Sequence, residues 1–211
     1  MTREERALEG NRVLVTGGGT GYGAAIARRF AAAGARVVAG DADSIEPAEV
    51  QALVTDAAGR LGGLDILVNT VHGAHVPTPV LDLTAEEFDA QIALNVRSVF
   101  LAVKYSIPHL SSGSVIINLA STAARRPHPG LAAYNASTGS LITLTRGLAA
   151  ELGPRIRVNA ICTSAPSAQR IPMGREVTGD DVAGAALFLA APRSGFLTGV
   201  CLEVGGGRDI E

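Results

Sequence analysis

Short apolar runs alternate along the chain with longer segments in which apolar residues recur at helical spacing. Runs of about four to eight apolar residues indicate buried strands, and the longer periodic segments indicate helices. Almost continuously apolar strands separated by helices are typical of a parallel sheet covered on both faces. The pattern predicts strands at 12–16, 35–40, 64–69, 114–120, 155–161 and 200–204, and helices at 21–33, 47–61, 84–110, 131–152 and 178–190.

The length of 211 residues suits one α/β domain better than two. No linker, repeat or low-complexity tract divides the chain, so residues 1–211 are predicted to form a single domain. The net charge of −2 and the pI near 6.1 give no reason to expect nucleic acid or an anionic membrane as a partner. No apolar run reaches the roughly 18 residues of a membrane span, so a cytoplasmic location is expected.

Cysteine and histidine are too few and too scattered to predict a metal site. Cys162 and Cys201 each lie in an apolar run and are interpreted as small buried hydrophobic residues rather than as a disulfide. His72 and His75 share one loop without a nearby cysteine or carboxylate cluster, and are interpreted as ordinary loop residues. No metal is therefore predicted.

A glycine-rich turn between the first strand and the first helix carries the clearest functional signal. Such a turn must be tight, must let the backbone approach a pyrophosphate, and must open a helix whose free N–H groups face the phosphates. The arrangement predicts a doubly wound, Rossmann-type fold that binds a nicotinamide dinucleotide. The predicted cofactor residues in this turn are Gly17, Gly19, Thr20, Gly21, Tyr22 and Gly23.

An acidic residue, Asp41, ends the second predicted strand. A carboxylate there can accept hydrogen bonds from both hydroxyls of the adenosine ribose and would repel a 2′-phosphate. This favours NAD over NADP. Two alternatives stay open, because Asp43 is close enough to take the role and Asp41 could be an ordinary exposed loop residue.

The chain resembles the short-chain dehydrogenase/reductase family over nearly its whole length. The turn Thr16–Gly23, TGGGTGYG, resembles that family's TGxxxGxG, and Asn95 in Asn-Val-Arg-Ser looks like its helix asparagine. Ser121 looks like the catalytic serine, and Tyr134 follows thirteen residues later at the family's usual spacing. The segments 155–160, 171–175 and 196–199 are also similar to family segments.

This resemblance implies hydride transfer between a nicotinamide cofactor and a carbonyl or secondary alcohol. Tyr134 would give or take the proton on the reacting oxygen, and Ser121 would hold that oxygen. Asn69 and Gly73 would lie in the loop that lines the ribose groups. The resemblance also implies a small-molecule substrate and a homodimer or homotetramer formed through the helices at 84–110 and 131–152.

The sequence departs from the family at Thr138, where members carry a lysine one helical turn after the tyrosine. Threonine can bond to a ribose hydroxyl but brings no charge, and an unassisted tyrosine has a pKa of about 10. Proton abstraction from an alcohol should suffer more than proton donation to a ketone, so any activity should favour reduction. Lys104 is expected on the opposite helix face, and Arg125 and Arg126 are interpreted as solvated loop residues.

Four further departures alter the site. The loop 69–73 has one residue more than the family's NNAG, and Thr163-Ser164 replaces the family's Pro-Gly. The segment 163–169 is too short for the usual substrate lid. Five residues separate Asp41 from Pro47, so we expect the third, edge strand and its helix to be missing.

These departures leave more than one functional hypothesis. The first is an NAD(P)-dependent oxidoreductase that uses Ser121 and Tyr134, with Asn95 and Thr138 completing the catalytic set. The second is a catalytically deficient relative that acts as a binding, scaffold or regulatory protein. The third is a non-redox enzyme that uses Ser121 and Tyr134 for proton transfer or elimination.

Overall fold

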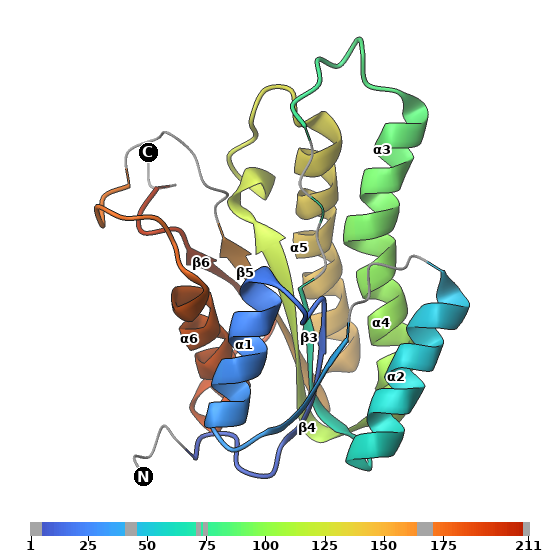
Figure 1. Ribbon diagram of the computed structural model, residues 1–211, viewed down its shortest axis with the longest axis vertical. Coiled ribbons are helices and arrows are strands. Elements are labelled where there is room, and N and C mark those ends of the chain that lie inside the picture. The colour runs from blue at the N-terminus through green and yellow to red at the C-terminus, as the bar shows by residue number, and fades with distance from the viewer. Residues whose placement is uncertain (1–5, 41–45, 71–72, 74–75, 164–170, 209–211) are drawn as a thin grey trace.

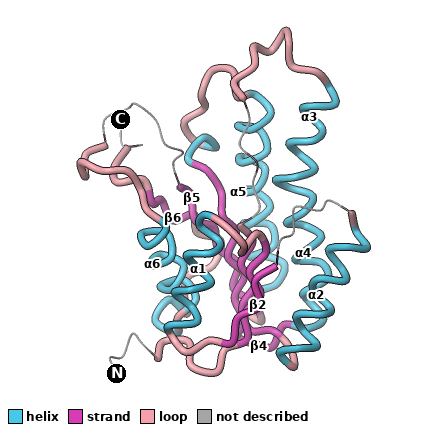
Figure 2. The backbone as a smooth tube through the Cα atoms, in the orientation of Figure 1, coloured by secondary structure: helices cyan, strands magenta, loops and turns pink. Residues whose placement is uncertain are grey.

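A six-stranded parallel sheet forms the central layer of the domain, and helices cover both of its faces (Figures 1 and 2). The computed structural model describes residues 6–40, 46–70, 73, 76–163 and 171–208. The strands are β1 (Arg12–Thr16), β2 (Arg36–Gly40), β3 (Leu64–Asn69), β4 (Leu110–Ser121), β5 (Ile156–Thr163) and β6 (Cys201–Val204). The helices are α1 (Gly21–Ala32), α2 (Pro47–Leu61), α3 (Ala85–Ile92), α4 (Ser98–Ser106), α5 (Ala132–Leu152) and α6 (Gly179–Ala190).

The strand order is β2-β1-β3-β4-β5-β6, and every pair is parallel. β1 pairs with β2 on one side and β3 on the other, so the order of the strands reverses at β1. Open α/β sheets bind their ligands at such a switch point, outside the carboxyl ends of the strands. The predicted doubly wound Rossmann-type fold is confirmed.

β2 is an edge strand of this sheet, which agrees with the expected loss of the family's third strand. Within the described residues, no strand pairs with its outer side. Only Val38 is buried along β2, whereas four of the five residues of β1 are buried. The buried core is therefore formed mainly by the central strands, and the edge strand β2 contributes little to it.

Two apolar clusters fill the space between the sheet and its helices. α1 and α6 pack against one face, around Phe30 and Ile117, while α2, α4 and α5 pack against the other, around Leu67 and Ile116 (Figure 1). Both faces of β3 and β4 are covered, which is why these strands are apolar along their length. None of the helices in the described segments is long and apolar enough to cross a membrane.

The helix predicted at 84–110 is largely confirmed, but it contains a π-helical turn and ends before residue 110. α3 ends at Ile92, a π-helical turn occupies Ala93–Arg97, and α4 ends at Ser106. Pro108 follows in a short 3₁₀ turn, and proline lacks the N–H that an α-helix requires in its interior. β4 therefore begins at Leu110 rather than at 114.

The interpretation of the two cysteines as free thiols is wrong. Cys162 on β5 and Cys201 on β6 form a disulfide, with Cα atoms 6.2 Å apart. The sequence separates them by 39 residues, but β5 and β6 are hydrogen-bonded neighbours, so the fold brings them together. The expected burial is correct for Cys162, which is 0% exposed, whereas Cys201 is only partly buried. Their pairing depends on a strand order that composition does not reveal.

We predict that Cys201→Ser lowers the free energy of unfolding by about 2–4 kcal/mol in non-oxidising, non-reducing buffer, because the disulfide constrains the unfolded chain. Denaturant titration measures this change. The matched control adds a reductant, which should bring the wild type down to the stability of the variant. The denatured, unreduced wild type should show no titratable thiol; two thiols there would contradict the prediction.

Candidate cofactor site and active site

The turn between β1 and α1 brings the backbone of both elements unusually close. Gly17 has a φ of +68°, a conformation that L side chains rarely adopt. A Cβ added at Gly23 would collide with the carbonyl oxygen of Gly17 and with the hydroxyl oxygen of Thr70. Only glycine at position 23 lets the first turn of α1 lie directly over the end of β1.

The amino end of α1 is left open for an anion. Thr20 occupies the N-cap position without a capping hydrogen bond from its side chain, and the first turn holds no acidic residue. By contrast, α3 and α6 begin with capping boxes, Thr84 with Glu87 and Thr178 with Asp181. Uncapped N–H groups at a positive helix end suit a pyrophosphate, so the turn fits a dinucleotide.

Thr70 supports this turn from the neighbouring strand end, a role that we did not predict. Its hydroxyl donates to the carbonyl oxygen of Thr16 at 2.7 Å, and the carbonyl oxygen of Gly17 lies 3.1 Å away. Its position directly after β3, next to the strand that carries the glycine turn, was the signal available in the sequence.

A chain of buried polar side chains crosses the carboxyl half of the sheet. The Asn69 side chain lies 3.2 Å from the Thr16 hydroxyl and donates to Asn118 at 2.9 Å. Asn118 in turn donates to Thr145 of α5 at 2.9 Å. Asn69 was predicted to line the cofactor; its side chain is 1% exposed and is engaged with protein atoms. It therefore aligns the strand ends around the site.

Ser121 and Tyr134, predicted as the catalytic pair, lie together. Ser121 ends β4 and its hydroxyl accepts a hydrogen bond from the backbone N–H of Ala123 at 3.1 Å. Tyr134 is the third residue of α5. Burial raises the pKa of the Tyr134 phenol, a hydrogen bond with Ser121 partly offsets this effect, and the nearby phenol of Tyr22 raises the pKa further.

Asn95 lies in the π-helical turn and connects the loop after β3 to α5. Its Oδ1 accepts from the backbone N–H of Gly73 at 3.0 Å, and its Nδ2 donates to Gln91 at 3.2 Å and to Ser137 at 2.9 Å. Ser137 donates to the carbonyl oxygen of Tyr134 at 2.9 Å. The network links Gly73, a predicted cofactor residue, to the first turn of α5. Sequence reasoning missed Ser137, although a serine three residues after Tyr134 on a helix can bond back to its carbonyl.

Thr138 lies one helical turn after Tyr134, but its hydroxyl points back into the helix. It donates to the carbonyl oxygen of Tyr134 at 3.0 Å and lies 3.2 Å from that of Asn135. The side chain is 1% exposed. Thr138 therefore fills its position by bonding to the backbone and supplies no charge to the phenol.

The three alternative cations interact with groups other than Tyr134. Arg125 forms an ion pair with Glu203 of β6, and Arg126 donates to the carbonyl oxygen of Arg208 at 2.9 Å. Lys104 is exposed on α4, as expected, with its ammonium 5.9 Å from the ring centre of Tyr105. No cation is among the groups that shift the pKa of Tyr134 in the described structure.

Some predicted residues lie outside the described part of the chain. These are Asp41 with its alternative Asp43, and the loop histidines His72 and His75. Ser164 and the rest of the predicted short lid segment, residues 164–169, also lie outside it. The described residues contain no group of three or more histidine, cysteine, aspartate and glutamate side chains that could hold a metal ion.

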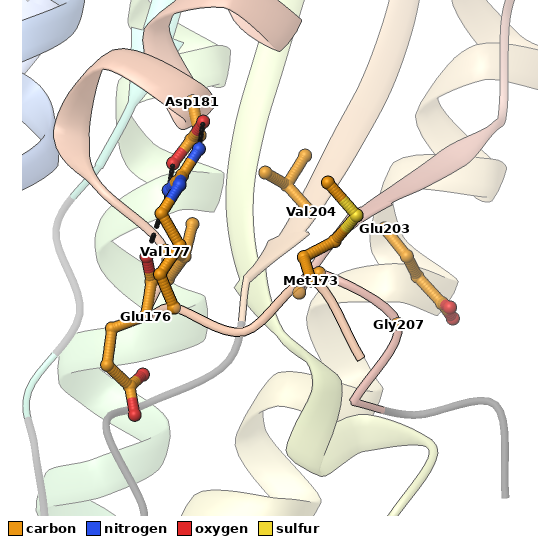
Figure 3. Close-up of a pocket in the computed structure, with 10 residues that line it drawn as sticks. Met173, Glu176, Val177, Asp181, Glu203, Val204 and Gly207 are labelled. Carbon is orange, nitrogen blue, oxygen red and sulfur yellow. Dashed lines mark hydrogen bonds and ion pairs between the residues drawn. The ribbon is translucent and has the colours of Figure 1, made fainter. Parts of the chain in front are cut away.

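A separate cavity of about 420 Å³ lies beside β6, between that strand and the segment that leads into α6 (Figure 3). Its charged side chains are paired: Arg175 with Asp181 at 2.6 Å, Glu176 with Arg208 at 2.9 Å, and Glu203 with Arg125. Its described walls include none of the predicted catalytic or cofactor residues.

The comparisons with known proteins agree with this geometry. A family model described as enoyl-(acyl carrier protein) reductase matches residues 41–169. The 4-formylbenzenesulfonate dehydrogenase of Comamonas testosteroni is 36% identical, with 93% of this chain and 97% of the relative covered. The bovine L-xylulose reductase is 35% identical, covering 95% of this chain and 97% of the relative. The chain belongs to the short-chain dehydrogenase/reductase family.

Solved structures extend the likeness to three dimensions. A dehydrogenase/reductase from Sinorhizobium meliloti superposes with a TM-score of 0.91 at 33% identity, covering 98% of each chain. A 3-ketoacyl-(acyl-carrier-protein) reductase from Brucella melitensis, complexed with NADH, gives 0.88 at 38% identity, covering 95% of this chain and 99% of the other. The chain is thus an oxidoreductase-family protein with an NAD(P)-binding fold.

We predict that Gly23→Ala abolishes NADH binding, because the added methyl group would force α1 away from the carbonyl oxygen of Gly17. Gly59→Ala is the matched control: Gly59 lies on the exposed side of α2, and its Cβ would meet nothing within 4 Å. That variant should bind NADH normally and gain about 0.5–1 kcal/mol of stability. Fluorescence titration measures the binding. Normal NADH affinity in Gly23→Ala would rule out this turn as the cofactor-binding site.

Proposed function

We propose that this protein is an NAD(P)-dependent oxidoreductase that transfers hydride to the carbonyl group of a small molecule. The observation that carries the proposal is the buried Tyr134 phenol, hydrogen-bonded to Ser121 at the carboxyl edge of the sheet. The glycine turn after β1 opens onto the same edge. The names of the relatives support this class of reaction, since one acts on L-xylulose and another on meso-2,3-butanediol.

Each of the predicted site residues has a distinct role in such a reduction. The glycine turn Gly17–Gly23 would hold the cofactor, which would supply the hydride for the carbonyl carbon. The Tyr134 hydroxyl donates its proton to the carbonyl oxygen, and the C=O double bond becomes a C–H and an O–H bond. Ser121 holds that oxygen in place. Asn95 acts as a positioning residue through Ser137 and the backbone of Tyr134.

The electrostatics of Tyr134 favour the reductive direction. Its pKa is raised above the ordinary value because the phenol is buried, and Thr138 brings no charge to lower it. At neutral pH the phenol is therefore protonated, which is the state a proton donor needs. Oxidation of an alcohol requires the ionised phenolate, which burial disfavours.

The preference for NAD over NADP rests on Asp41, whose carboxylate would bond to the ribose and repel a 2′-phosphate. Structures of relatives include complexes with NADH and with NADP, so the family accommodates both cofactors. The homodimeric or homotetrameric assembly and the cytoplasmic location stay predictions.

A second candidate function is that of a catalytically deficient relative that binds a cofactor without turnover. The uncharged Thr138, whose hydroxyl is engaged with backbone carbonyl groups, favours it. A non-redox use of Ser121 and Tyr134 would need the same two hydroxyls without cofactor. Cofactor binding and carbonyl reduction, measured separately, distinguish these candidates.

We predict that Tyr134→Phe reduces carbonyl-reductase activity at least about 100-fold, because it removes the proton donor. NADH consumption should be measured against 4-formylbenzenesulfonate, L-xylulose and diacetyl, and NADH affinity should stay within about twofold of the wild type. Tyr105→Phe, which removes a phenol from α4, is the control and should leave both quantities unchanged. Tight NADH binding by a wild type that reduces no carbonyl compound would favour the second candidate.

We predict that alcohol oxidation by the wild type rises with pH up to at least about 10, since the pKa of Tyr134 lies above its usual value. Reduction, which uses the protonated phenol, should not change with the ionisation of Tyr134 below that range. Thr138→Lys places an ammonium group one turn from the phenol and should shift the oxidation profile about one to three pH units lower. Thr138→Met controls for side-chain length. Identical pH profiles for the two variants would show that charge does not set the direction.

A further inference from the structure

Thr163 carries a buried hydroxyl group that no protein atom satisfies. It is the last residue of β5, and its side chain is 3% exposed. Its Oγ1 has no hydrogen-bond partner. Buried hydroxyl groups in folded proteins are almost always paired, so an unpaired one calls for a ligand or a water molecule.

Thr163 lies directly beside the proposed catalytic serine. β4 and β5 are parallel, and Ser121 and Thr163 are partners in their register. Partners in a parallel pair direct their side chains to the same face of the sheet, and neighbouring strands lie about 4.8 Å apart. Ser121 is also 3% exposed, and a ligand group held at one hydroxyl would lie about one strand spacing from the other.

The strand order restricts what meets Thr163. A dinucleotide with its pyrophosphate at the amino end of α1 and its reactive ring beside Ser121 must cross the end of β3, which lies between β1 and β4. β5 is the next strand in that direction. On a nicotinamide ring, the carboxamide is attached to the carbon next to the one that carries the hydride. The carboxamide group is therefore close to the reacting carbon.

Given the proposed function, we propose that the Thr163 hydroxyl binds the carboxamide group of the nicotinamide and sets the rotation of the ring beside Ser121 and Tyr134. The chemistry matches, because a hydroxyl group and a carboxamide each offer a donor and an acceptor. The family has proline at this position, and a proline side chain offers neither. Thr163 is thus a positioning residue that distinguishes this chain from the family pattern.

The unpaired hydroxyl also predicts an unusual effect on stability. Replacing an unpaired buried hydroxyl with a methyl group of the same shape removes a polar group that has lost its water without compensation. Thr163→Val should therefore melt at the same temperature as the wild type or higher, while binding the cofactor more weakly. A hydroxyl with a purely structural role would give the opposite result in the melting experiment.

The test compares NADH with ADP-ribose, which lacks the nicotinamide, by isothermal titration calorimetry. Thr163→Val should weaken NADH binding about three- to tenfold, the effect of one neutral hydrogen bond, and leave ADP-ribose binding unchanged. Thr163→Ser keeps the hydroxyl and should bind NADH like the wild type. Ser114→Ala is the matched control, because Ser114 also has a buried unpaired hydroxyl but lies near the amino end of β4. It should change neither affinity.

Each other outcome has a separate meaning. Equal loss of NADH and ADP-ribose affinity in Thr163→Val would overturn the inference, since the residue would then act through the fold. Unchanged NADH affinity with a raised KM for the carbonyl compound would overturn it too, because the hydroxyl would then serve the substrate. Failure of the wild type to bind NADH at millimolar concentration would instead overturn the proposed function, and the inference with it.

Discussion

The side-chain amides of Asn69 and Asn118 bridge three strand ends and one helix, and the proposed site is assembled around them. Thr16 ends the strand before the glycine turn, and Thr145 belongs to the helix that carries Tyr134. Removing one amide would leave buried donors and acceptors unpaired, which costs about 1–3 kcal/mol for each group. The cofactor turn and the proton donor come from elements that are distant in sequence, and this polar chain connects the elements that hold them.

The phenol of Tyr134 is buried, and no cation is among the groups that shift its pKa in the described structure. The same burial that fixes the phenol beside Ser121 also disfavours its ionisation, and neither Thr138 nor the nearby arginines oppose that effect. Arg125 and Arg126 are instead engaged with β6 and the turn that follows it. This environment favours the protonated phenol, which is the state that the proposed reduction requires.

Apolar periodicity and turn chemistry were sufficient to predict the fold class, whereas the edge position of β2 and the meeting of Ser121 with Tyr134 were predicted from the family resemblance. The fold class depends on local patterns. The spacing between Ser121 and Tyr134 can be interpreted only through the family resemblance. The π-helical turn at Asn95 has no such local signature, because it depends on hydrogen bonds to Gly73 and Ser137 from distant elements. The pairing of Cys162 with Cys201 and the unsatisfied hydroxyl of Thr163 likewise depend on which strands are neighbours. Pro108 indicated the end of a helix, but the long apolar stretch around it favoured a continuous helix in the sequence-based prediction.

The edge position of β2 also bears on how such a domain can change in size. An inner strand such as β3 makes hydrogen bonds on both sides and is buried on both faces, so its deletion would divide the sheet. A strand beyond β2 would be joined to the rest through one partner, and β2 itself has a single buried side chain. The alignment with the Comamonas relative spans 244 positions, more than the 211 residues of this chain, so the relative carries segments that this chain lacks. Material at the periphery of a parallel sheet can be lost in evolution while the central strands, and the chemistry at their ends, continue to fold as before.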